Sequence, residues 1–181
     1  MKLAIADPPY LGRADTWYGN NHNLGTGCYA ADKHPEAHLW DNPQTHIDLA
    51  RDLNDNYDGF AIACTPHSLS TYLSVLKTGS STGIRVMAWI KPNAMPGGNR
   101  LTLSWESVII KMIAERKGRN KGKHMRDYHI APAPRKNFTG SKPESWTHWV
   151  LDAIGYQEGD EVIDLFKGSG SVDTAINTYV M

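Results

Sequence analysis

The sequence Asp7-Pro8-Pro9-Tyr10, directly after a short apolar run, is the first group whose residue types could do chemistry. The two prolines lack an N–H and restrict the backbone, so the Asp7 carboxylate and the Pro8 carbonyl become rigid hydrogen-bond acceptors. Tyr10 adds an aromatic face beside them. Two acceptors and a ring suit an exocyclic amine of a planar base, as in proteins that hold a flipped base by its edge and by stacking. An Asp-capped turn after a strand is the structural alternative for this acceptor motif.

A second group lies towards the C-terminal end, where Asp164 ends another apolar run and Gly168-Ser169-Gly170 follows. Glycines let the backbone approach a ligand closely just before a helix N-terminus. This glycine turn (residues 164–170) is not a dinucleotide fingerprint, because Asp173 stands at the third glycine position, and no Gly-Lys-Ser/Thr follows it as in a phosphate-binding loop. It predicts either a ligand-binding turn or an ordinary glycine-rich connection between a strand and a helix.

Together, Asp-Pro-Pro-Tyr and the Asp-x-Phe-x-Gly-x-Gly sequence of the glycine turn resemble the motifs of S-adenosylmethionine-dependent DNA amino-methyltransferases, which act on adenine N6 or cytosine N4. The catalytic motif comes first here, which is similar to the permuted beta group of that family. Lys142-Pro143 before a helix, Gly-Asp-Glu-Val-Ile at 159–163 and Trp105-Glu106 add to the resemblance. It extends over nearly the whole chain and is closest to short enzymes of phages and actinobacteria.

The resemblance implies direct methyl transfer from S-adenosylmethionine to an exocyclic amine of a flipped DNA base. Adenine N6 is favoured over cytosine N4, because the Asp form of the tetrapeptide is commoner for adenine. Asp7 and the Pro8 carbonyl would accept hydrogen bonds from the amine, beside Pro9, and Tyr10 would stack on the base. The cofactor would contact residues from two segments, namely Asp164, Phe166, Gly168, Ser169 and Gly170 together with Ser141, Lys142 and Pro143.

Two other functions stay open at this point. An RNA or protein amide methyltransferase is the alternative enzyme, because similar Pro-Pro-Tyr pockets serve those amines. A nucleic-acid-binding module with a degenerate cofactor pocket is the non-enzymatic alternative. It is suggested by a departure from the family pattern that follows the glycine turn.

In the family, a further strand after the glycine turn carries an acid that holds the cofactor ribose, whereas eleven residues follow Gly170 here. Glu106, Glu144, Asp173 or a second subunit would then complete the pocket. The strand expected over 161–165 would lie near a sheet edge, where unpaired backbone groups invite pairing with a partner. A homodimer is therefore a hypothesis.

Charge is distributed unevenly along the 181 residues, although 19 basic and 19 acidic side chains cancel. The basic segment (residues 111–142) has a net charge of +8, from 10 basic and 2 acidic residues, and both flanks are net negative. Contacts to DNA phosphates need such a cluster, and the family's target-recognition segment occupies this place in the chain. The predicted DNA contacts are Arg116, Lys117, Arg119, Lys121, Lys123 and Arg126. A solvated surface loop is the alternative.

These groups must be positioned by an α/β fold, because short apolar runs alternate with helical patterns. Strands are expected over 2–6, 59–64, 84–90, 105–112 and 161–165, and helices over 43–54, from 65 onward, over 145–154 and over 171–180. The resemblance implies a Rossmann-like methyltransferase, with a mostly parallel sheet of about five strands that is permuted and lacks the strands after the cofactor motif. One domain (1–181) would comprise a catalytic half (1–110), the basic segment and a cofactor segment (143–181).

Several features exclude other classes of protein. Cys28 and Cys64 form no disulfide framework, which favours a reducing compartment. No apolar run approaches the ~18 residues of a membrane span, so we expect a cytoplasmic protein, in a bacterial cell or a phage-infected host. Cys28, His34 and His38 match no regular zinc spacing, and no metal is expected.

Overall fold

The computed structural model describes residues 1–19, 36–97, 100–134 and 140–179. They form one mixed sheet whose strand order is β5-β3-β4-β2-β1-β6. Five strands run in one direction and β4 runs opposite to them, which confirms the mostly parallel sheet. The strands are β1 (Lys2–Ala6), β2 (Gly59–Cys64), β3 (Ile84–Ile90), β4 (Trp105–Lys111), β5 (Tyr128–Ile130) and β6 (Glu161–Asp164).

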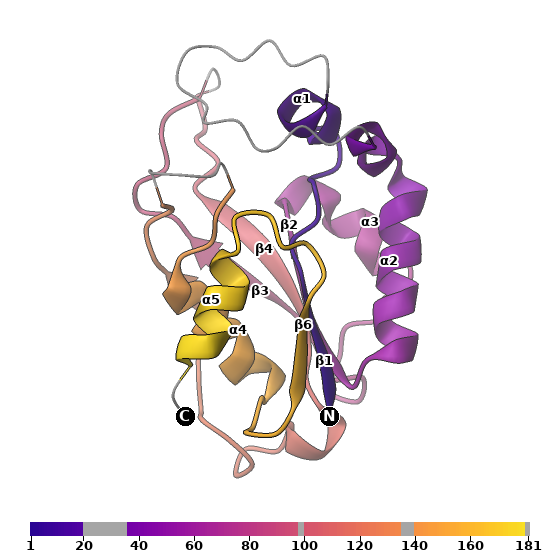
Figure 1. Cartoon of the computed structure of the whole chain (residues 1–181), viewed down its shortest axis with the longest axis vertical. Coiled ribbons are helices and arrows are strands. Elements are labelled where there is room, and N and C mark those ends of the chain that lie inside the picture. Colours follow the sequence, from indigo (N-terminus) through magenta and orange to yellow (C-terminus); the bar gives the residue numbers. More distant parts are fainter. Residues whose placement is uncertain (20–35, 98–99, 135–139, 180–181) are drawn as a thin grey trace.

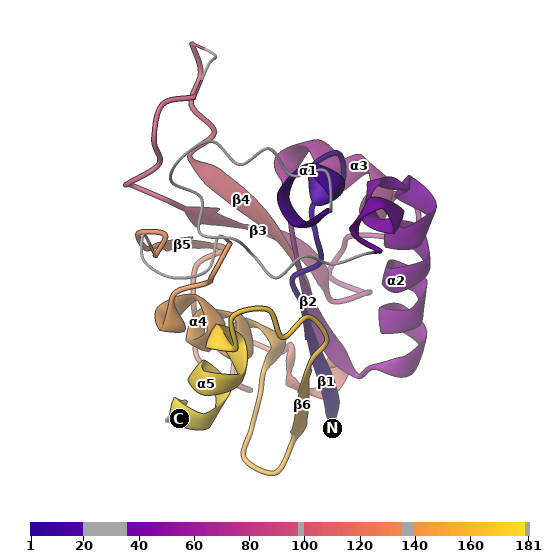
Figure 2. The same cartoon turned by 45° about the horizontal axis from the view of Figure 1, so that its top comes forward.

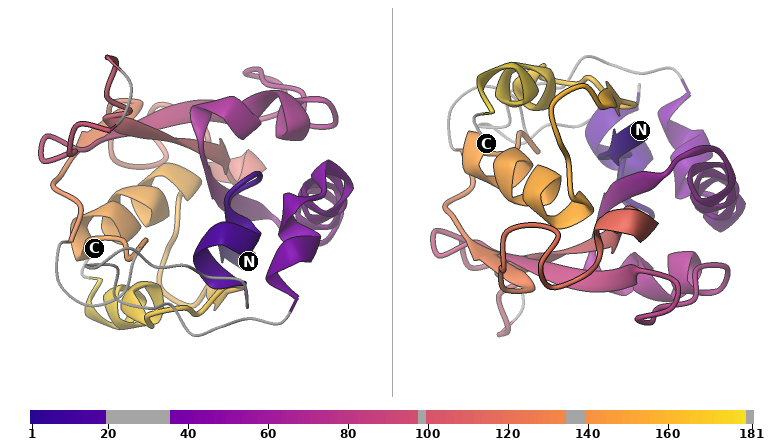
Figure 3. Two further views of the ribbon diagram at one scale, coloured as in Figure 1. Left: turned by 90° about the horizontal axis from the view of Figure 1, so that it is seen from above. Right: turned by 90° about the horizontal axis from the view of Figure 1, so that it is seen from below.

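Helices cover both faces of this sheet, as Figures 1 and 3 show. The α-helices are α1 (Ala14–Tyr18), α2 (Pro43–Asn56), α3 (Leu69–Leu73), α4 (Glu144–Ile154) and α5 (Ser171–Thr178). Short 3-10 turns are η1 (Ala37–Asp41), η2 (Pro66–Ser68) and η3 (Ala114–Arg116). Local sequence sets the helix ends: the Asn42 side chain caps α2 ahead of Pro43, and Gly155, at a φ of 89°, ends α4.

The core consists of two layers, one on each face. Leu3 and Ile5 of β1 pack on the side of α4 and α5, while Ala4 and Ala6 pack on the side of α2 and α3. Strands buried on both faces are apolar at every position rather than at every second one. This explains why β1 and β2 could be predicted as continuous apolar runs.

One feature of the sheet differs from the sequence prediction, and a second was not predicted. The sheet has a sixth strand, β5, inside the basic segment; three residues are too short for a pattern, and β5 exists because it pairs with β3 from Ala88 to Ile90. The direction of β4 could not be predicted either, because an apolar run does not encode its orientation. Within the described residues, which end at Tyr179, β6 is followed only by α5, and β6 lies at an edge of the sheet as expected.

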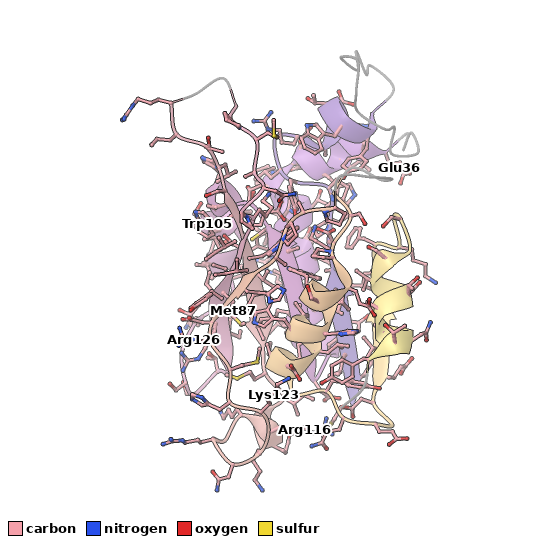
Figure 4. The ribbon with its side chains drawn as sticks, turned by 90° about the vertical axis from the view of Figure 1, so that its left-hand side faces the viewer. Glu36, Met87, Trp105, Arg116, Lys123 and Arg126 are labelled. Carbon is pink, nitrogen blue, oxygen red and sulfur yellow. The ribbon has the colours of Figure 1, made fainter. Side chains whose placement is uncertain are left out.

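The strand directions give the sheet a carboxyl edge, where the five co-directional strands end, and an amino edge, where they begin. β4 crosses between them, because Trp105 pairs with Ile90 at the carboxyl edge and Lys111 pairs with Ile84 at the amino edge. Seven residues of strand span about 20 Å. Figure 4 shows the separation: Trp105 lies towards one end of the molecule and Arg116 at the other. Figure 2 shows α1 near the carboxyl ends of the central strands.

Candidate active site

The acceptor motif leaves β1 at the carboxyl edge, and its carboxylate does not stand alone. Asp7 Oδ2 lies 2.6 Å from the ammonium nitrogen of Lys142, 135 residues away in sequence. Asp7 Oδ1 lies 3.4 Å from the Tyr10 hydroxyl, a long contact. The two oxygens of Asp7 are therefore unequal, since one is held by a full charge and the other is held weakly.

The Tyr10 hydroxyl has a stronger partner in Glu106, near the start of β4. It donates to Glu106 Oε2 at 2.7 Å, and the other carboxylate oxygen of Glu106 accepts from Lys91 at 2.8 Å. Lys91 directly follows β3, so the hairpin of β3 and β4 supplies both groups. This contact fixes where the Tyr10 ring lies. The sequence resemblance included Glu106 but assigned it no such role, and Lys91 was missed altogether.

Lys142 is the most enclosed of these charged groups, with 2% of its side chain exposed. Besides Asp7 it donates to the Tyr10 hydroxyl at 3.2 Å and to the Gly140 carbonyl at 3.1 Å. Its nitrogen also lies 5.7 Å from the ring centroids of both Trp89 and Trp146. Aromatic faces attract a cation, which helps to explain how an ammonium group is tolerated in this interior.

Two carboxylates and two ammonium groups thus share one buried site. Burial raises the pKa of Asp7, and the attraction of Lys142 opposes this without cancelling it. For Glu106, burial also favours the neutral acid, but Lys142 and Lys91 outweigh it and lower the pKa. Burial would lower the pKa of Lys142, yet the two carboxylates raise it. The formal charges of the four groups sum to zero, so the site can hold them as ion pairs without a net buried charge.

The glycine turn lies beside the acceptor motif, because β6 pairs with β1 and brings Asp164 opposite Ile5. One oxygen of Asp164 accepts from the Phe166 N–H at 3.1 Å. The other is buried and has no hydrogen-bond partner among the described residues. Burial raises the pKa of this carboxyl to about 6.

Backbone geometry leaves room above the turn. Gly168 and Gly170 have φ values of 42° and 71°, which a larger residue rarely adopts, and a Cβ on Gly170 would meet nothing within 4 Å. The Ser169 hydroxyl contacts that of Ser141 at 3.3 Å, so the segment before α4, with Pro143 as the N-cap of that helix, lies against the turn. An unpartnered buried carboxylate oxygen beside an open glycine turn fits a ligand that carries an ammonium group.

The acids considered for a ribose have different surroundings. Glu106 is engaged by Tyr10 and Lys91, whereas Glu144, in the first turn of α4, accepts from Thr178 of α5 at 2.5 Å. Asp173 lies in the first turn of α5 and pairs only with Lys167, at 3.6 Å, among the described residues. Asp173 is therefore the candidate nearest in sequence to the turn and least committed elsewhere.

The first part of the basic segment lies at the amino edge, away from Asp7. Several of its cations make structural contacts there: Arg116 pairs with Asp160 and donates to the Gly155 carbonyl, Lys117 donates to the Ser81 carbonyl, and Lys123 pairs with Asp152. Arg119, Lys121 and Arg126 are exposed. The segment borders a cavity of about 520 Å³ with Met87 and Met112 among its apolar walls. The structure does not bring the six predicted DNA contacts together with the acceptor motif.

Other expectations concern metals and membranes. Cys28 and His34 lie outside the described residues, and within the described ones no cluster of three His, Cys, Asp or Glu side chains could hold a metal ion. None of the described helices has the length and apolarity to cross a membrane.

Comparison with known proteins supports the fold. No family model matches the chain, and neither does any curated protein. The chain is similar to the crystal structure of an M1.HpyAVI–SAM complex, with 22% identity, a TM-score of 0.57 and coverage of 98% of this chain and 78% of that one. It is also similar to the crystal structure of M1.HpyAVI, with 21% identity, a TM-score of 0.52 and coverage of 97% and 75%. These similarities confirm the α/β, Rossmann-like methyltransferase fold.

Proposed function

We propose that this chain is an enzyme that uses S-adenosylmethionine to methylate an exocyclic amine of a DNA base. The observation that carries the proposal is the pairing of β6 with β1, which places the glycine turn and the acceptor motif side by side at the carboxyl edge. Ligands of open α/β sheets bind at such an edge. The fold shared with a protein solved as a complex with SAM adds support.

The cofactor would lie along the glycine turn. S-adenosylmethionine supplies an electrophilic methyl group on a sulfonium, together with an ammonium and a carboxylate. The free oxygen of Asp164 would accept from the ammonium, and Gly168 and Gly170 would let the backbone approach closely. The remaining proposed contacts are Phe166, Ser169, Ser141, Lys142 and Pro143.

The acceptor motif would act on the target amine. Its nitrogen is a poor nucleophile while its lone pair is conjugated with the ring, and Asp7 and the Pro8 carbonyl would accept its two N–H groups and draw it out of conjugation. A bound S-adenosylmethionine would supply the methyl group, and positive charge would develop on the amine nitrogen as its bond to that group forms and the bond from sulfur breaks. The Asp7 carboxylate would stabilise that charge and take the proton that the amine gives up.

The base and the DNA contacts are finer parts of the proposal. Adenine N6 is proposed over cytosine N4 because the tetrapeptide has Asp rather than Ser. The six cations Arg116, Lys117, Arg119, Lys121, Lys123 and Arg126 stay predicted phosphate contacts; from the amino edge they would reach DNA well away from the target base.

A homodimer through β6 also stays a prediction, which light scattering would test, and so does the division of one domain into the three segments.

The decisive experiment is mass spectrometry of nucleosides from DNA that was co-expressed with the protein. N6-methyladenine above background supports the proposal, and N4-methylcytosine would correct the base alone. Incubating purified protein with tritiated S-adenosylmethionine and DNA, RNA or protein then compares the substrates. If no DNA is labelled while RNA or protein is, the proposed substrate is wrong; without any label or cofactor binding, the enzyme proposal is wrong as well.

A further inference from the structure

Lys142 joins the two halves of the candidate active site. The resemblance assigned it to the cofactor, and its neighbour Ser141 does contact the glycine turn. Its ammonium group, however, lies 2.6 Å from Asp7 Oδ2. In the described residues, no other side-chain ammonium lies within ion-pair distance of Asp7, because Lys91 binds Glu106 instead. From this position, Lys142 can act on the Asp7 carboxylate as directly as on a bound cofactor.

An acceptor carboxylate in this interior needs a cation. Burial favours the neutral acid, and a protonated Asp7 would lose one of its acceptor oxygens. Among the other groups that face Asp7, Glu106 repels a second negative charge, whereas the long hydrogen bond from the Tyr10 hydroxyl weakly favours the carboxylate. The remaining titratable neighbours, none of them cationic, are Tyr18, Cys64, Tyr72 and Asp164. Lys142 supplies the main opposing influence, by direct contact.

The contacts of Lys142 also decide which oxygen of Asp7 remains available. Oδ2 is held by the ammonium at 2.6 Å, whereas the hydroxyl near Oδ1, at 3.4 Å, belongs to Tyr10. That hydroxyl donates its proton to Glu106 at 2.7 Å. Oδ1 is thus left as the acceptor with spare capacity, in a carboxylate whose orientation is fixed by its other oxygen.

We propose that Lys142 is a positioning residue for the methyl acceptor: its ammonium group keeps Asp7 ionised and holds Oδ2, so that Oδ1 faces the target amine. This inference rests on the proposed function and deepens it. Trp89, Trp146 and the Gly140 carbonyl hold the ammonium group in place, and Glu106 with its partner Lys91 completes the charge balance.

The test is the pH dependence of methyl transfer in Lys142→Met at saturating cofactor. Without the cation, the acidic limb of the kcat profile should move to higher pH by at least about one unit. We therefore expect kcat near neutral pH to fall tenfold or more, and to recover in part at higher pH. Lys142→Arg should restore the wild-type limb, and Lys77→Met on the surface should leave it unchanged. If Lys142→Met only raises the cofactor KM and keeps the wild-type limb, the residue serves the cofactor and the inference is wrong.

A second measurement does not depend on activity. Carbon-13 NMR of the aspartate carboxyls, with Asp7 assigned through Asp7→Asn, follows the titration of Asp7 itself. The inference expects Asp7 to titrate at higher pH in Lys142→Met than in the wild type, and equal titrations would overturn it. Should the wild type transfer no methyl group, the proposed function fails while this titration still tests the role of Lys142.

The double variant Lys142→Met/Glu106→Gln guards against misfolding. It removes one cation and one anion, so the site keeps its charge balance. Asp7 then has no cation in contact but also no second carboxylate beside it. We expect its titration to fall between those of the wild type and of Lys142→Met, and a titration at or below the wild-type value would contradict the inference.

Discussion

The two edges of the sheet both carry charged groups, but they use them differently. At the carboxyl edge, Asp7, Glu106, Lys91 and Lys142 are largely buried, contact one another and sum to zero charge. At the amino edge the cations outnumber their acidic partners, and Lys123, for example, is 72% exposed in its pair with Asp152. The charged groups at the carboxyl edge are thus few and mostly buried. Those at the amino edge are more numerous and mostly exposed, although Arg116 and Asp160 form a largely buried pair there.

This difference suits the two edges to different roles, namely chemistry at the carboxyl edge and long-range attraction of a polyanion at the amino edge. A buried carboxylate with a fixed partner can hold one geometry and act on a reacting atom. Exposed cations are screened by salt and contribute little to orientation, although they attract a polyanion. The positive charge that the sequence concentrates in the basic segment lies mostly at the amino edge, whereas the candidate catalytic residues lie at the carboxyl edge.

Removing the acceptor charge should have the largest effect. Asp7→Asn keeps the shape of the side chain but turns one acceptor oxygen into a donor, so we expect kcat for methyl transfer to fall at least about 100-fold. Tritium transfer to DNA measures it. Asp48→Asn, an exposed carboxylate on α2, is the matched control and should keep full activity. If Asp7→Asn keeps its activity, Asp7 is not the acceptor and the catalytic site does not lie at the carboxyl edge.

The cofactor side of the same edge is tested by Asp164→Asn. Loss of a charged acceptor should weaken S-adenosylmethionine binding about ten- to a hundredfold by calorimetry. Because the pKa of Asp164 is raised to about 6, wild-type affinity should also fall as the pH drops through that value.

The same substitution should stabilise the protein. A carboxyl whose pKa is raised on folding contributes stability below its unfolded value of about 4, and this contribution is lost as the pH rises through about 6. Asp164→Asn should therefore have a higher Tm than the wild type at pH 8 and little difference at pH 4. A lower Tm at pH 8 would show that the carboxylate has a partner there.

Glu106→Gln sharpens the comparison within the buried site. The Tyr10 hydroxyl would lose a charged acceptor and Lys91 its partner, so we expect about a tenfold lower kcat. Since Glu106 raises the pKa of Asp7, its removal should move the acidic limb of the kcat profile to lower pH, opposite to Lys142→Met. Glu115→Gln, on η3, is the control. A limb that moves upward would show that Glu106 does not act through charge.

Changes at the amino edge should have the smallest effect. In the triple variant Arg119→Gln/Lys121→Gln/Lys123→Gln we expect DNA affinity to fall two- to threefold, with a smaller salt dependence and unchanged cofactor affinity. Fluorescence anisotropy across a salt series measures this. Arg116 is left intact because its pair with Asp160 joins η3 to the loop before β6. A loss above a hundredfold would show that DNA binds chiefly at this edge.

Sequence patterns predicted the strands best where consecutive residues are buried in the sheet. Gly59–Cys64 and Ile84–Ile90 have the bounds that their runs predicted, because the first is buried at every position and the second is apolar except for the exposed Arg85. Tyr128–Ile130 escaped prediction because its strand conformation depends on pairing with β3. The meeting of Lys142 with Asp7, and of Glu106 with Tyr10, left no local signal, since each pair is far apart along the chain.

The sequence by itself determined the fold class and the two motifs, because prolines, glycines and apolar runs constrain the backbone locally. It also determined how charge is distributed along the chain. Only the tertiary structure decided which charges meet. β4 runs against its neighbours and carries Glu106 to the carboxyl edge, β6 pairs with β1, and the segment before α4 inserts Lys142 between the two motifs. Such long-range contacts depend on strand order and direction, which no local run of residues encodes.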